Sequence, residues 1–219
     1  MALTGPAVPP RSGRAARQLV VFLHGLGADG NDLIGLAPYF AEQLPDAGFL
    51  SPHAPFACDM APIGRQWFSM KERTPDALLR GLETARPLVD SFLDQALATS
   101  GLGDDSLALV GFSQGTMIAL YIALRRKLPI ASLVGFSGLL AAPERLAAEL
   151  TARPPVLLIH GDQDPVVPFD MMAQASNALQ RVQVPVTSLR CPGLGHSIDD
   201  AGLAAAIRFV DSGFAKMQA

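Results

Sequence analysis

The sequence predicts a single α/β domain with a doubly wound, mostly parallel sheet and helices on both faces. The chain has 219 residues, of which 49% are hydrophobic, and this is enough to bury one large core. Short apolar runs bounded by Gly, Pro or Asp alternate with longer segments of helical period. Such alternation is typical of right-handed crossovers between parallel strands.

Six apolar runs are expected to form strands. In chain order they are Leu19 to His24, Ala47 to Ser51, Leu107 to Phe112, Ser132 to Phe136, Val156 to His160 and Val184 to Leu189. Five of them have the nearly continuous apolar character of strands buried in a parallel sheet, and Ala47 to Ser51 fits this pattern least well.

Helical periodicity fills the spaces between these runs. The predicted helices are Leu33 to Gln43, Asp76 to Ala98, Thr116 to Leu124, Pro143 to Leu150, Phe169 to Leu179 and Ala201 to Phe214. Thr74 followed by Pro75 is a start signal for the longest of them, with the threonine as N-cap and proline at the first helical position. Pro87 is expected to kink or split that helix.

Two segments lack a period. Residues 1–17 are rich in Pro, Gly, Ala and Arg, and they are predicted to be a flexible N-terminal tail with room for one short strand, before a domain over residues 18–219. Residues 52–73 contain the only tryptophan, Trp67, followed by Phe68. Loops of this length inside a domain are usually functional, so this segment is expected to cover the site.

Charge and composition exclude several classes of protein. The formal net charge is -3 and the 17 Lys and Arg residues are dispersed, which predicts no nucleic-acid partner. Arg125, Arg126 and Lys127 fall where a helix should end, so they are expected to complement the helix dipole. The two cysteines, Cys58 and Cys191, are interpreted as free thiols. No secretory signal or membrane span is recognisable, which predicts a cytoplasmic protein.

The segment Gly111 to Gly115 reads GFSQG, a G-x-S-x-G pattern between a predicted strand and a predicted helix. In this context Ser113 occupies a tight turn that exposes its hydroxyl at a helix N-terminus, as an acyl-transfer nucleophile requires. The alternative is that the two glycines only allow a helix to pack closely on a strand.

A serine nucleophile needs a histidine base and a carboxylate to orient it. His196 alone has the right chain order and a flexible glycine-containing loop before the last helix. Asp162 and Asp164 both follow a strand and both remain candidates for the acid. Asp164 is favoured, because Pro165 biases it towards an extended conformation, whereas Asp162 is more easily a turn former that bonds its own backbone.

The oxyanion of a tetrahedral intermediate needs backbone donors. The N–H of Gln114, directly after the nucleophile, is one candidate, and the N–H of Leu26 in the glycine-rich loop His24 to Gly30 is the second. The alternative reading of that loop is a phosphate cradle, but its glycines match neither common phosphate-binding pattern in register.

With these residues in place, the chain resembles the phospholipase/carboxylesterase family of α/β hydrolases, which includes the acyl-protein thioesterases. The blocks that carry the resemblance are Val21 to Gly27, Gln66 to Phe68, Gly111 to Gly115, Gly135 to Gly138, His160 to Pro168 and Gly195-His196. The resemblance implies an α/β-hydrolase fold, a triad of Ser113, Asp164 and His196, and oxyanion donors at Leu26 and Gln114.

The resemblance also implies that Trp67 and Phe68 form the wall of the acyl pocket and bind substrate. An aromatic that simply seals the sheet edge is the alternative. Arg65 and Gln66 before the tryptophan, and Ser69 after Phe68, look more like the bacterial esterase branch than the eukaryotic depalmitoylases.

The predicted function is that of a serine carboxylesterase acting on small to medium carboxylic esters through an acyl-enzyme, with no cofactor and no metal. Within the enzymes, an acyl-protein thioesterase or a lysophospholipase is the alternative. From another class, the alternative is a non-catalytic receptor that binds a small ligand in the same cleft. The expected partner is a small-molecule ester, and a homodimer is the assembly left open.

Overall fold

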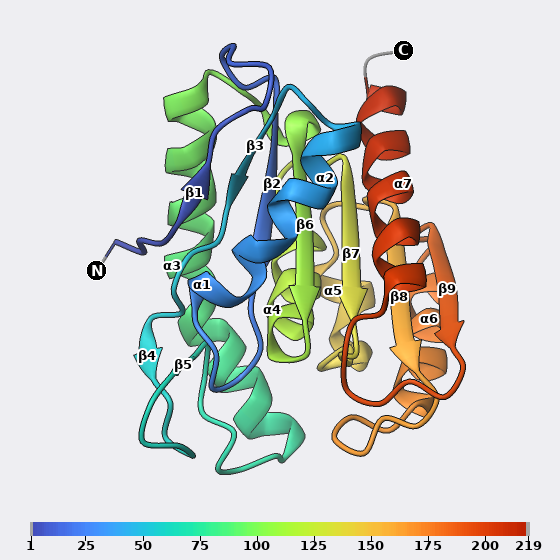
Figure 1. Cartoon of the computed structure of the whole chain (residues 1–219). Helices are drawn as coiled ribbons and strands as arrows, with labels where there is room; N and C mark the ends of the chain where they lie inside the picture. Colours follow the sequence, from blue (N-terminus) through green and yellow to red (C-terminus); the bar gives the residue numbers. More distant parts are fainter. Residues whose placement is uncertain (1, 218–219) are drawn as a thin grey trace.

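A seven-stranded sheet forms the middle layer of the computed structural model, which describes residues 2–217 (Figure 1). The strand order across the sheet is β1-β3-β2-β6-β7-β8-β9. The strands are β1 (Ala7–Val8), β2 (Gln18–Leu23), β3 (Ala47–Leu50), β6 (Leu107–Phe112), β7 (Ser132–Phe136), β8 (Val156–Gly161) and β9 (Val186–Cys191). All neighbouring pairs are parallel except β1 with β3.

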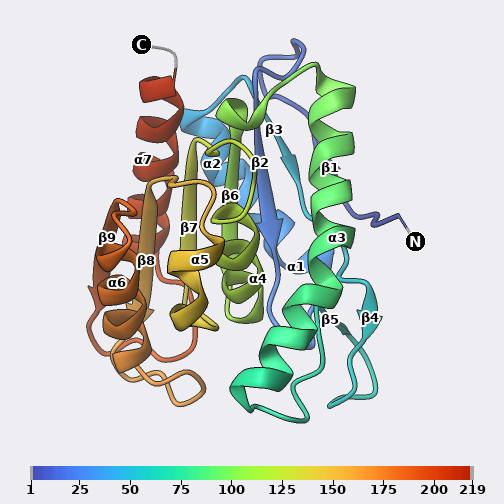
Figure 2. The same ribbon diagram turned by 180° about the vertical axis from the view of Figure 1, so that it is seen from behind.

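Helices cover both faces of this sheet. On one face lie α1 (Gly30–Leu33), η1 (Ile34–Leu36), α2 (Ala37–Gln43) and α7 (Asp200–Met217), and on the other lie α3 (Pro75–Ser100), α4 (Gln114–Ala123), η3 (Pro143–Arg145), α5 (Leu146–Glu149) and α6 (Asp170–Arg181) (Figures 1 and 2). The short helix η2 (Asp104–Ser106) precedes β6. The predicted doubly wound α/β architecture is therefore confirmed.

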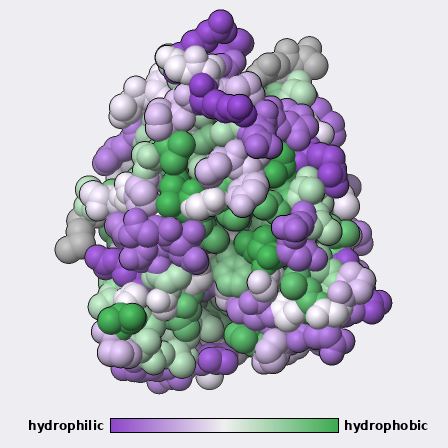
Figure 3. Space-filling model, in the orientation of Figure 1, coloured by the Kyte–Doolittle hydropathy of each residue, from purple (hydrophilic) through white to green (hydrophobic). Residues whose placement is uncertain are grey.

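The central strands are apolar on both sides because each side has its own core. In β2, Val21 and Leu23 belong to the core under α3 to α6, whereas Val20 and Phe22 belong to the core under α2 and α7. Successive side chains of a strand point to opposite faces, so a strand covered on both sides needs a continuous apolar run. Apolar side chains also reach the surface between the polar outer sides of the helices on the α2 and α7 face (Figure 3).

The burial of two strands differs from the prediction. Strand β3, predicted with the least support, is almost completely buried between β1 and β2. Strand β9 begins at Val186, two residues later than the predicted start, and much of it is exposed, including Thr187, Ser188 and Arg190. The prediction of a buried last strand is wrong because β9 lies at the sheet edge and pairs only with β8.

The longest helix is not split. Thr74 caps it, accepting from the amide of Ala77 at 3.3 Å, as predicted. Helix α3 then continues through Pro87 and changes direction along its length (Figure 2). Fully buried side chains on both sides of the proline, such as Leu82 and Leu93, hold the two halves against the sheet.

Two other predicted helices begin or end with a tighter turn. The region Leu33 to Gln43 is divided into the end of α1, the 3₁₀ helix η1 and α2, and Pro38 lies in the first turn of α2. The region Pro143 to Leu150 consists of η3 followed by α5. Proline suits the first turn of a helix because its missing N–H would have no partner there.

The N-terminal segment lies along the sheet edge. Strand β1 pairs with β3, the amide of Ser51 donates to Pro6 O at 3.0 Å, and the amide of Arg17 donates to Asp46 O at 2.9 Å. Leu3 is buried in the core. These contacts place residues 2–17 on the domain surface, while Met1, Gln218 and Ala219 lie outside the described residues. The division into a flexible tail and a domain at residue 17 stays a prediction.

Residues 52–73 contain a small antiparallel hairpin, β4 (Phe56–Ala57) with β5 (Arg65–Gln66), beside the N-terminal half of α3 (Figures 1 and 2). The rest of the segment has no helix or strand. In the described part of the chain, no helix combines the length and the apolar character needed to cross a membrane.

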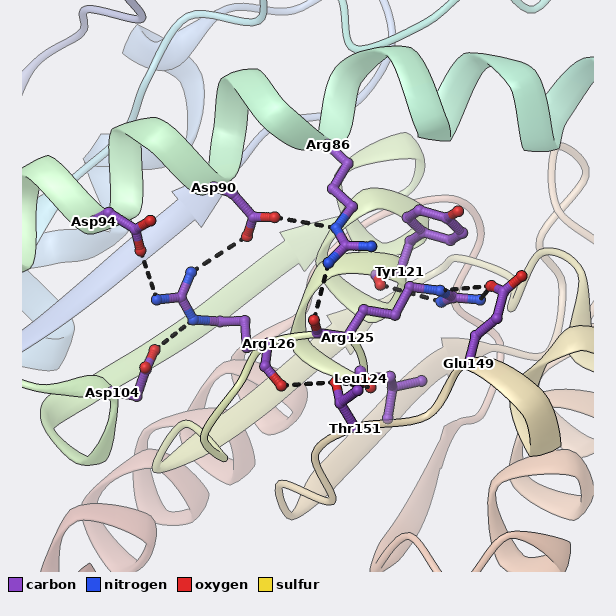
Figure 4. Close-up of polar contacts among 10 residues, drawn as sticks. All are labelled: Arg86, Asp90, Asp94, Asp104, Tyr121, Leu124, Arg125, Arg126, Glu149 and Thr151. Atoms are coloured by element: carbon purple, nitrogen blue, oxygen red, sulfur yellow. Dashed lines mark hydrogen bonds and ion pairs between the residues drawn. The ribbon is translucent and has the colours of Figure 1, made fainter.

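Arg126, from the predicted dipole-complementing cluster, is instead the buried centre of an ion cluster whose outer carboxylate, Asp94, is exposed (Figure 4). Its guanidinium contacts Asp90 at 3.2 Å, Asp94 at 2.8 Å and Asp104, while the side chain is only 8% exposed. Helix α3 supplies two of these carboxylates and η2 the third. Arg126 therefore ties α3 to the segments on either side of β6.

Arg125 combines the predicted role with a second one. Its Nη1 donates to Tyr121 O at 3.1 Å, in the last turn of α4, as expected for a cation at a helix C-terminus. Its Nη2 lies 2.6 Å from Glu149 Oε2, and its guanidinium stacks 3.9 Å from the centre of the Tyr121 ring (Figure 4). Arg125 thus joins α4 to α5.

Candidate functional site

The predicted site residues gather at one edge of the sheet. Parallel strands β2, β6, β8 and β9 all end at this edge, as Figure 1 shows. Ser113 directly follows β6, Asp164 follows β8, and His196 lies in the loop between β9 and α7. Ligands of open α/β sheets bind at the carboxyl ends of the strands, so the topology alone brings these three loops together.

Ser113 occupies a strained backbone conformation, with φ 54° and ψ -116°. A side chain is rarely tolerated at positive φ, and surrounding structure must hold it there. The amide of Ser113 donates to Phe136 O at 2.9 Å, and its carbonyl accepts from the amide of Thr116 at 3.0 Å. The Thr116 hydroxyl lies 2.8 Å from the same Phe136 oxygen. These bonds fix the turn on the neighbouring strand β7.

The two glycines of the pattern are required by close backbone contacts. A Cβ on Gly111 would lie 2.6 Å from the backbone of Gly115, and a Cβ on Gly115 would lie 1.8 Å from Leu23 O. The packing interpretation of the pattern is therefore correct for the two glycines, which let α4 pack closely on β2 and β6. Ser113 is only 8% exposed, and its role as the nucleophile stays a prediction.

Asp164 is the acid that reaches the histidine. Its Oδ2 lies 2.7 Å from His196 Nδ1, and its Oδ1 accepts from the amides of Val166 and Val167 at 2.8 and 2.9 Å. The carboxylate side chain has no exposed surface. Burial by itself raises the pKa of Asp164, but the hydrogen bonds from His196 and from the two amides outweigh it and hold the pKa below its usual range. The buried carboxylate is therefore ionised at neutral pH.

This arrangement fixes the orientation of His196. An ionised carboxylate only accepts, so the Nδ1 of neutral His196 carries the proton and its Nε2 is free to act as a base. The imidazole packs on Phe112, the residue before Ser113, with ring centres 4.8 Å apart. Among residues 2–217, no hydrogen bond joins His196 to the Ser113 hydroxyl. The structure thus joins Asp164 to His196 directly and brings the His196 ring beside the turn that holds Ser113.

Asp162 has different partners from Asp164. It accepts from Arg190 at 2.6 and 2.8 Å and from the amide of Gly193 at 2.7 Å. The expectation that Asp162 bonds its own backbone is wrong, because the carboxylate reaches across to the loop after β9. Asp162 therefore braces the loop that carries His196, and its hydrogen bonds from Arg190 and Gly193 lower its pKa.

The loop that carries Leu26 comes close to Ser113, and Gln114 directly follows that serine. A Cβ on Gly25, the residue before Leu26, would lie 3.4 Å from Ser113 Cβ. Neither the Leu26 amide nor the Gln114 amide donates to an acceptor among the described residues. The next part of the loop is paired with the hairpin, since the amide of Gly27 donates to Arg65 O at 2.9 Å.

Trp67 and Phe68 both belong to the buried core, and Phe68 is only 2% exposed. Trp67 has no exposed surface, and its indole N–H donates to His24 O at 2.8 Å, so this geometry favours the sealing interpretation for that residue. Phe68 lines a cavity of about 590 Å³ between the hairpin and α3, together with Phe56 and Gln66. The substrate-binding role predicted for the pair stays a prediction.

Comparisons with known proteins identify the family of this chain. The family model described as phospholipase/carboxylesterase matches residues 7–213. The chain belongs to the phospholipase/carboxylesterase family. Esterase YpfH of Escherichia coli is 30% identical over 195 residues, which are 89% of this chain and 82% of that protein. Acyl-protein thioesterase 1 of Neurospora crassa is 29% identical, over 81% of this chain and 79% of that protein.

Solved structures give the same result. The crystal structure of esterase PE8 superposes with a TM-score of 0.93 and 43% identity, over 97% of this chain and 99% of that one. The predicted family and its α/β-hydrolase fold are confirmed, and with them the class of ester hydrolases.

Two sets of contacts at the site were not predicted from the sequence. The sequence predicts His160 only as the last residue of a strand, yet its Nε2 lies 3.2 Å from Asp164 Oδ2 and 2.9 Å from Val167 O. Because a carbonyl only accepts, this Nε2 carries a proton and donates it to Val167 O, while the same nitrogen lies in contact with the Asp164 oxygen that accepts from His196. The spacing of four residues between His160 and Asp164 was the available signal.

The side chain of Gln114 makes the second set of contacts that was not predicted from the sequence. It is buried, accepts from the amide of Trp67 at 2.9 Å and donates to Phe68 O at 2.8 Å. The residue that supplies a predicted oxyanion donor from its backbone therefore also holds the covering segment in place. A polar residue at the start of an otherwise apolar helix was the signal for it.

Proposed function

We propose that the protein is a serine carboxylesterase that hydrolyses small to medium carboxylic esters through an acyl-enzyme on Ser113. The single observation that supports this most strongly is the 2.7 Å contact of Asp164 with His196 beside the strained serine turn. Esterase YpfH and esterase PE8, by their names, support an ester as the substrate.

In this mechanism His196 Nε2 takes the proton of Ser113 as the hydroxyl oxygen attacks the ester carbonyl carbon. The oxyanion that forms accepts from the Leu26 and Gln114 amides, and loss of one such donor typically lowers the rate about 10²- to 10³-fold. His196 then protonates the departing alkoxide. It next removes a proton from water, which attacks the acyl-enzyme and releases the acid, while Asp164 stays ionised throughout.

The test is the replacement Ser113→Ala, assayed with p-nitrophenyl acetate and butyrate. Turnover should fall to background in a folded variant, because no other group can form the acyl-enzyme. Ser106→Ala is a matched control, since Ser106 immediately precedes the other end of the same strand, β6, and its hydroxyl contacts only Asp105 among the described residues. Unchanged turnover in Ser113→Ala would rule the proposal out.

The acyl group and the leaving group are the open parts of the proposal. The Neurospora crassa relative is named for acyl-protein thioesters, which supports thioesters as the second candidate, and a lysophospholipase is the third. A series of p-nitrophenyl esters from acetate to palmitate, run beside palmitoyl-CoA and a palmitoylated peptide, separates them. Short esters should be the best substrates if the proposal is right.

A non-catalytic receptor is the alternative from another class. A fluorophosphonate probe reacts only with an activated serine, so it should label the wild-type chain and leave Ser113→Ala unlabelled.

We also place the protein in the cytoplasm, without a nucleic-acid partner, on its dispersed charge and free cysteines. A homodimer stays a prediction that sedimentation would test.

A further inference from the structure

His24 is a buried histidine that the proposed mechanism does not use. It directly follows β2 and has no exposed surface. Its Nδ1 lies 2.8 Å from Gly25 O, and its Nε2 lies 3.1 Å from the amide nitrogen of Ala54. Both ring nitrogens are therefore bonded to backbone groups of different segments.

These two partners determine the protonation state of the ring. A carbonyl oxygen can only accept, so Nδ1 carries a proton, and an amide can only donate, so Nε2 does not. The imidazole is therefore the neutral Nδ1–H form. Burial, which lowers the pKa of His24, favours the same neutral state.

The hydrogen bond to Gly25 O orients the next amide. In a trans peptide the C=O of one residue and the N–H of the following residue point in opposite directions. The described residues contain no cis peptide bond, so the N–H of Leu26 points away from the side on which His24 holds Gly25 O. The amide of Ala28 also donates to this oxygen, at the longer distance of 3.3 Å.

The geometry matters because Gly25 lies directly beside the nucleophile. The position of a Cβ on Gly25 is 3.4 Å from Ser113 Cβ. Glycine has wide conformational freedom, so the peptide plane between Gly25 and Leu26 needs an external bond to stay in one orientation. His24 supplies that bond, and its own carbonyl is held by the indole of Trp67 at 2.8 Å.

We propose that His24 is a positioning residue of the oxyanion hole, whose Nδ1–H holds the Gly25 carbonyl so that the Leu26 N–H faces the oxyanion formed on Ser113. This inference rests on the proposed ester hydrolysis. It differs from a purely structural role, because the effect is specific to one backbone donor and to the transition state.

Two substitutions separate the two ring nitrogens. In His24→Asn the side-chain amide nitrogen can replace Nδ1 as the donor to Gly25 O, whereas in His24→Gln the side-chain oxygen can replace Nε2 as the acceptor for Ala54. We expect His24→Gln to lower kcat about 10- to 100-fold with KM within about threefold, and His24→Asn to retain at least ten times more kcat. His53→Gln, which removes a partly buried histidine bonded to the Gly30 amide, is the matched control and should stay within twofold.

A double-mutant cycle tests the route of the effect. Leu26→Pro removes the N–H itself, so His24→Gln should add less than threefold to the loss of kcat in that background. If the two losses multiply in full, His24 does not act through the Leu26 donor and the inference is overturned. Equal kcat losses in His24→Gln and His24→Asn would also overturn it.

The unmodified protein offers an independent measurement if the variants fail to fold. Two-dimensional ¹⁵N NMR of the histidine rings should show His24 as the neutral Nδ1–H tautomer at pH 7, and an Nε2–H tautomer would overturn the inference. Failure of the proposed function and failure of this inference give different results. A wild-type chain without esterase activity would contradict both. An active wild type together with unchanged kcat in folded His24→Gln would contradict only the role of His24.

Discussion

Two regions of the molecule bury charged side chains, and they do so in opposite ways. Around Arg126, between α3 and β6, the positive charge meets the carboxylates of Asp90, Asp94 and Asp104 (Figure 4). Around Asp164, at the carboxyl edge of the sheet, the negative charge meets histidine rings and backbone amides.

The difference lies in what is left without a partner. In the Arg126 cluster every charged group has a partner of opposite charge, and Asp90 also pairs with Arg86. At the sheet edge, His196 Nε2 and the amides of Leu26 and Gln114 have no acceptor or donor among the described residues. Unpaired polar groups in a partly buried place are unfavourable for folding, but they are what a transition state needs. The comparison supports a stabilising role for the first region and the proposed catalytic role for the second.

The largest effect is expected from Asp164→Asn. The amide can no longer hold His196 with its proton on Nδ1, so kcat should fall about 10³- to 10⁴-fold, measured with p-nitrophenyl butyrate. Asp162→Asn is the matched control, because Asp162 braces the same loop through Arg190 and Gly193, and its loss should be less than tenfold. Similar losses in both variants would contradict the separate roles given to the two aspartates.

Replacement of Arg126 by methionine should act on stability alone. Removing the cation leaves its partners Asp90, Asp94 and Asp104 facing one another, and the free energy of unfolding should drop by about 3 kcal/mol. Urea unfolding measures this, and kcat per folded molecule should not change. Arg145→Met removes ion pairs with Glu83 and Glu149 that are made by an exposed guanidinium, and it should have a much smaller effect. A large loss of kcat in the folded Arg126 variant would show that the Arg126 region also affects catalysis, contrary to the separate roles given to the two regions.

A smaller effect on thermal stability is expected from a change in pH. The lowered pKa of Asp164 means that its ionisation stabilises the fold above the ordinary aspartate pKa of about 3.9, and this stabilisation is lost as the pH falls through the folded value. The difference in Tm between the wild type and Asp164→Asn should therefore narrow below about pH 4. A Tm difference that stays constant down to pH 2 would show that the hydrogen bonds from His196, Val166 and Val167 do not stabilise the ionised carboxylate.

The smallest expected effect is a difference in reactivity between the two thiols. Burial and the neighbouring Asp199 raise the pKa of Cys191 to about 11, so this thiol stays protonated at pH 8. Cys58 is only partly buried. Titration of the native protein with a disulfide reagent should therefore modify Cys58 quickly and Cys191 only after unfolding. Rapid modification of both would mean that the edge near β9 opens more readily than its packing suggests.

The central fold was predictable because buried parallel strands have a simple sequence pattern. Runs such as Leu107 to Phe112 are apolar on both faces and are bounded by turn residues, so their positions agree with the structure within a residue or two. The edge strand β9 was less predictable, since its polar side chains depend on which strand happens to be outermost. The kink or split at Pro87 depended in turn on how firmly both halves of α3 pack.

The contacts of the site were predictable where chain order restricts the choice. The sequence order of serine, acid and histidine left few candidates, and the structure brings Asp164 to His196. The partners of Arg126 lie 22 to 36 residues away, and sequence offers no measure of which carboxylates will face it. The contacts of the Gln114 side chain were missed for the same reason, because they arise from packing between segments 46 and 47 residues apart.

The two-residue strand β1 has a practical consequence. By pairing with β3, it covers what would otherwise be an open row of backbone donors and acceptors beside Phe49 and Leu50. Unprotected edges of this kind recruit other chains, whereas the opposite edge, β9, carries exposed polar side chains that discourage it. A recombinant product truncated before Gln18 should therefore self-associate, and expression tags are better attached at the other terminus.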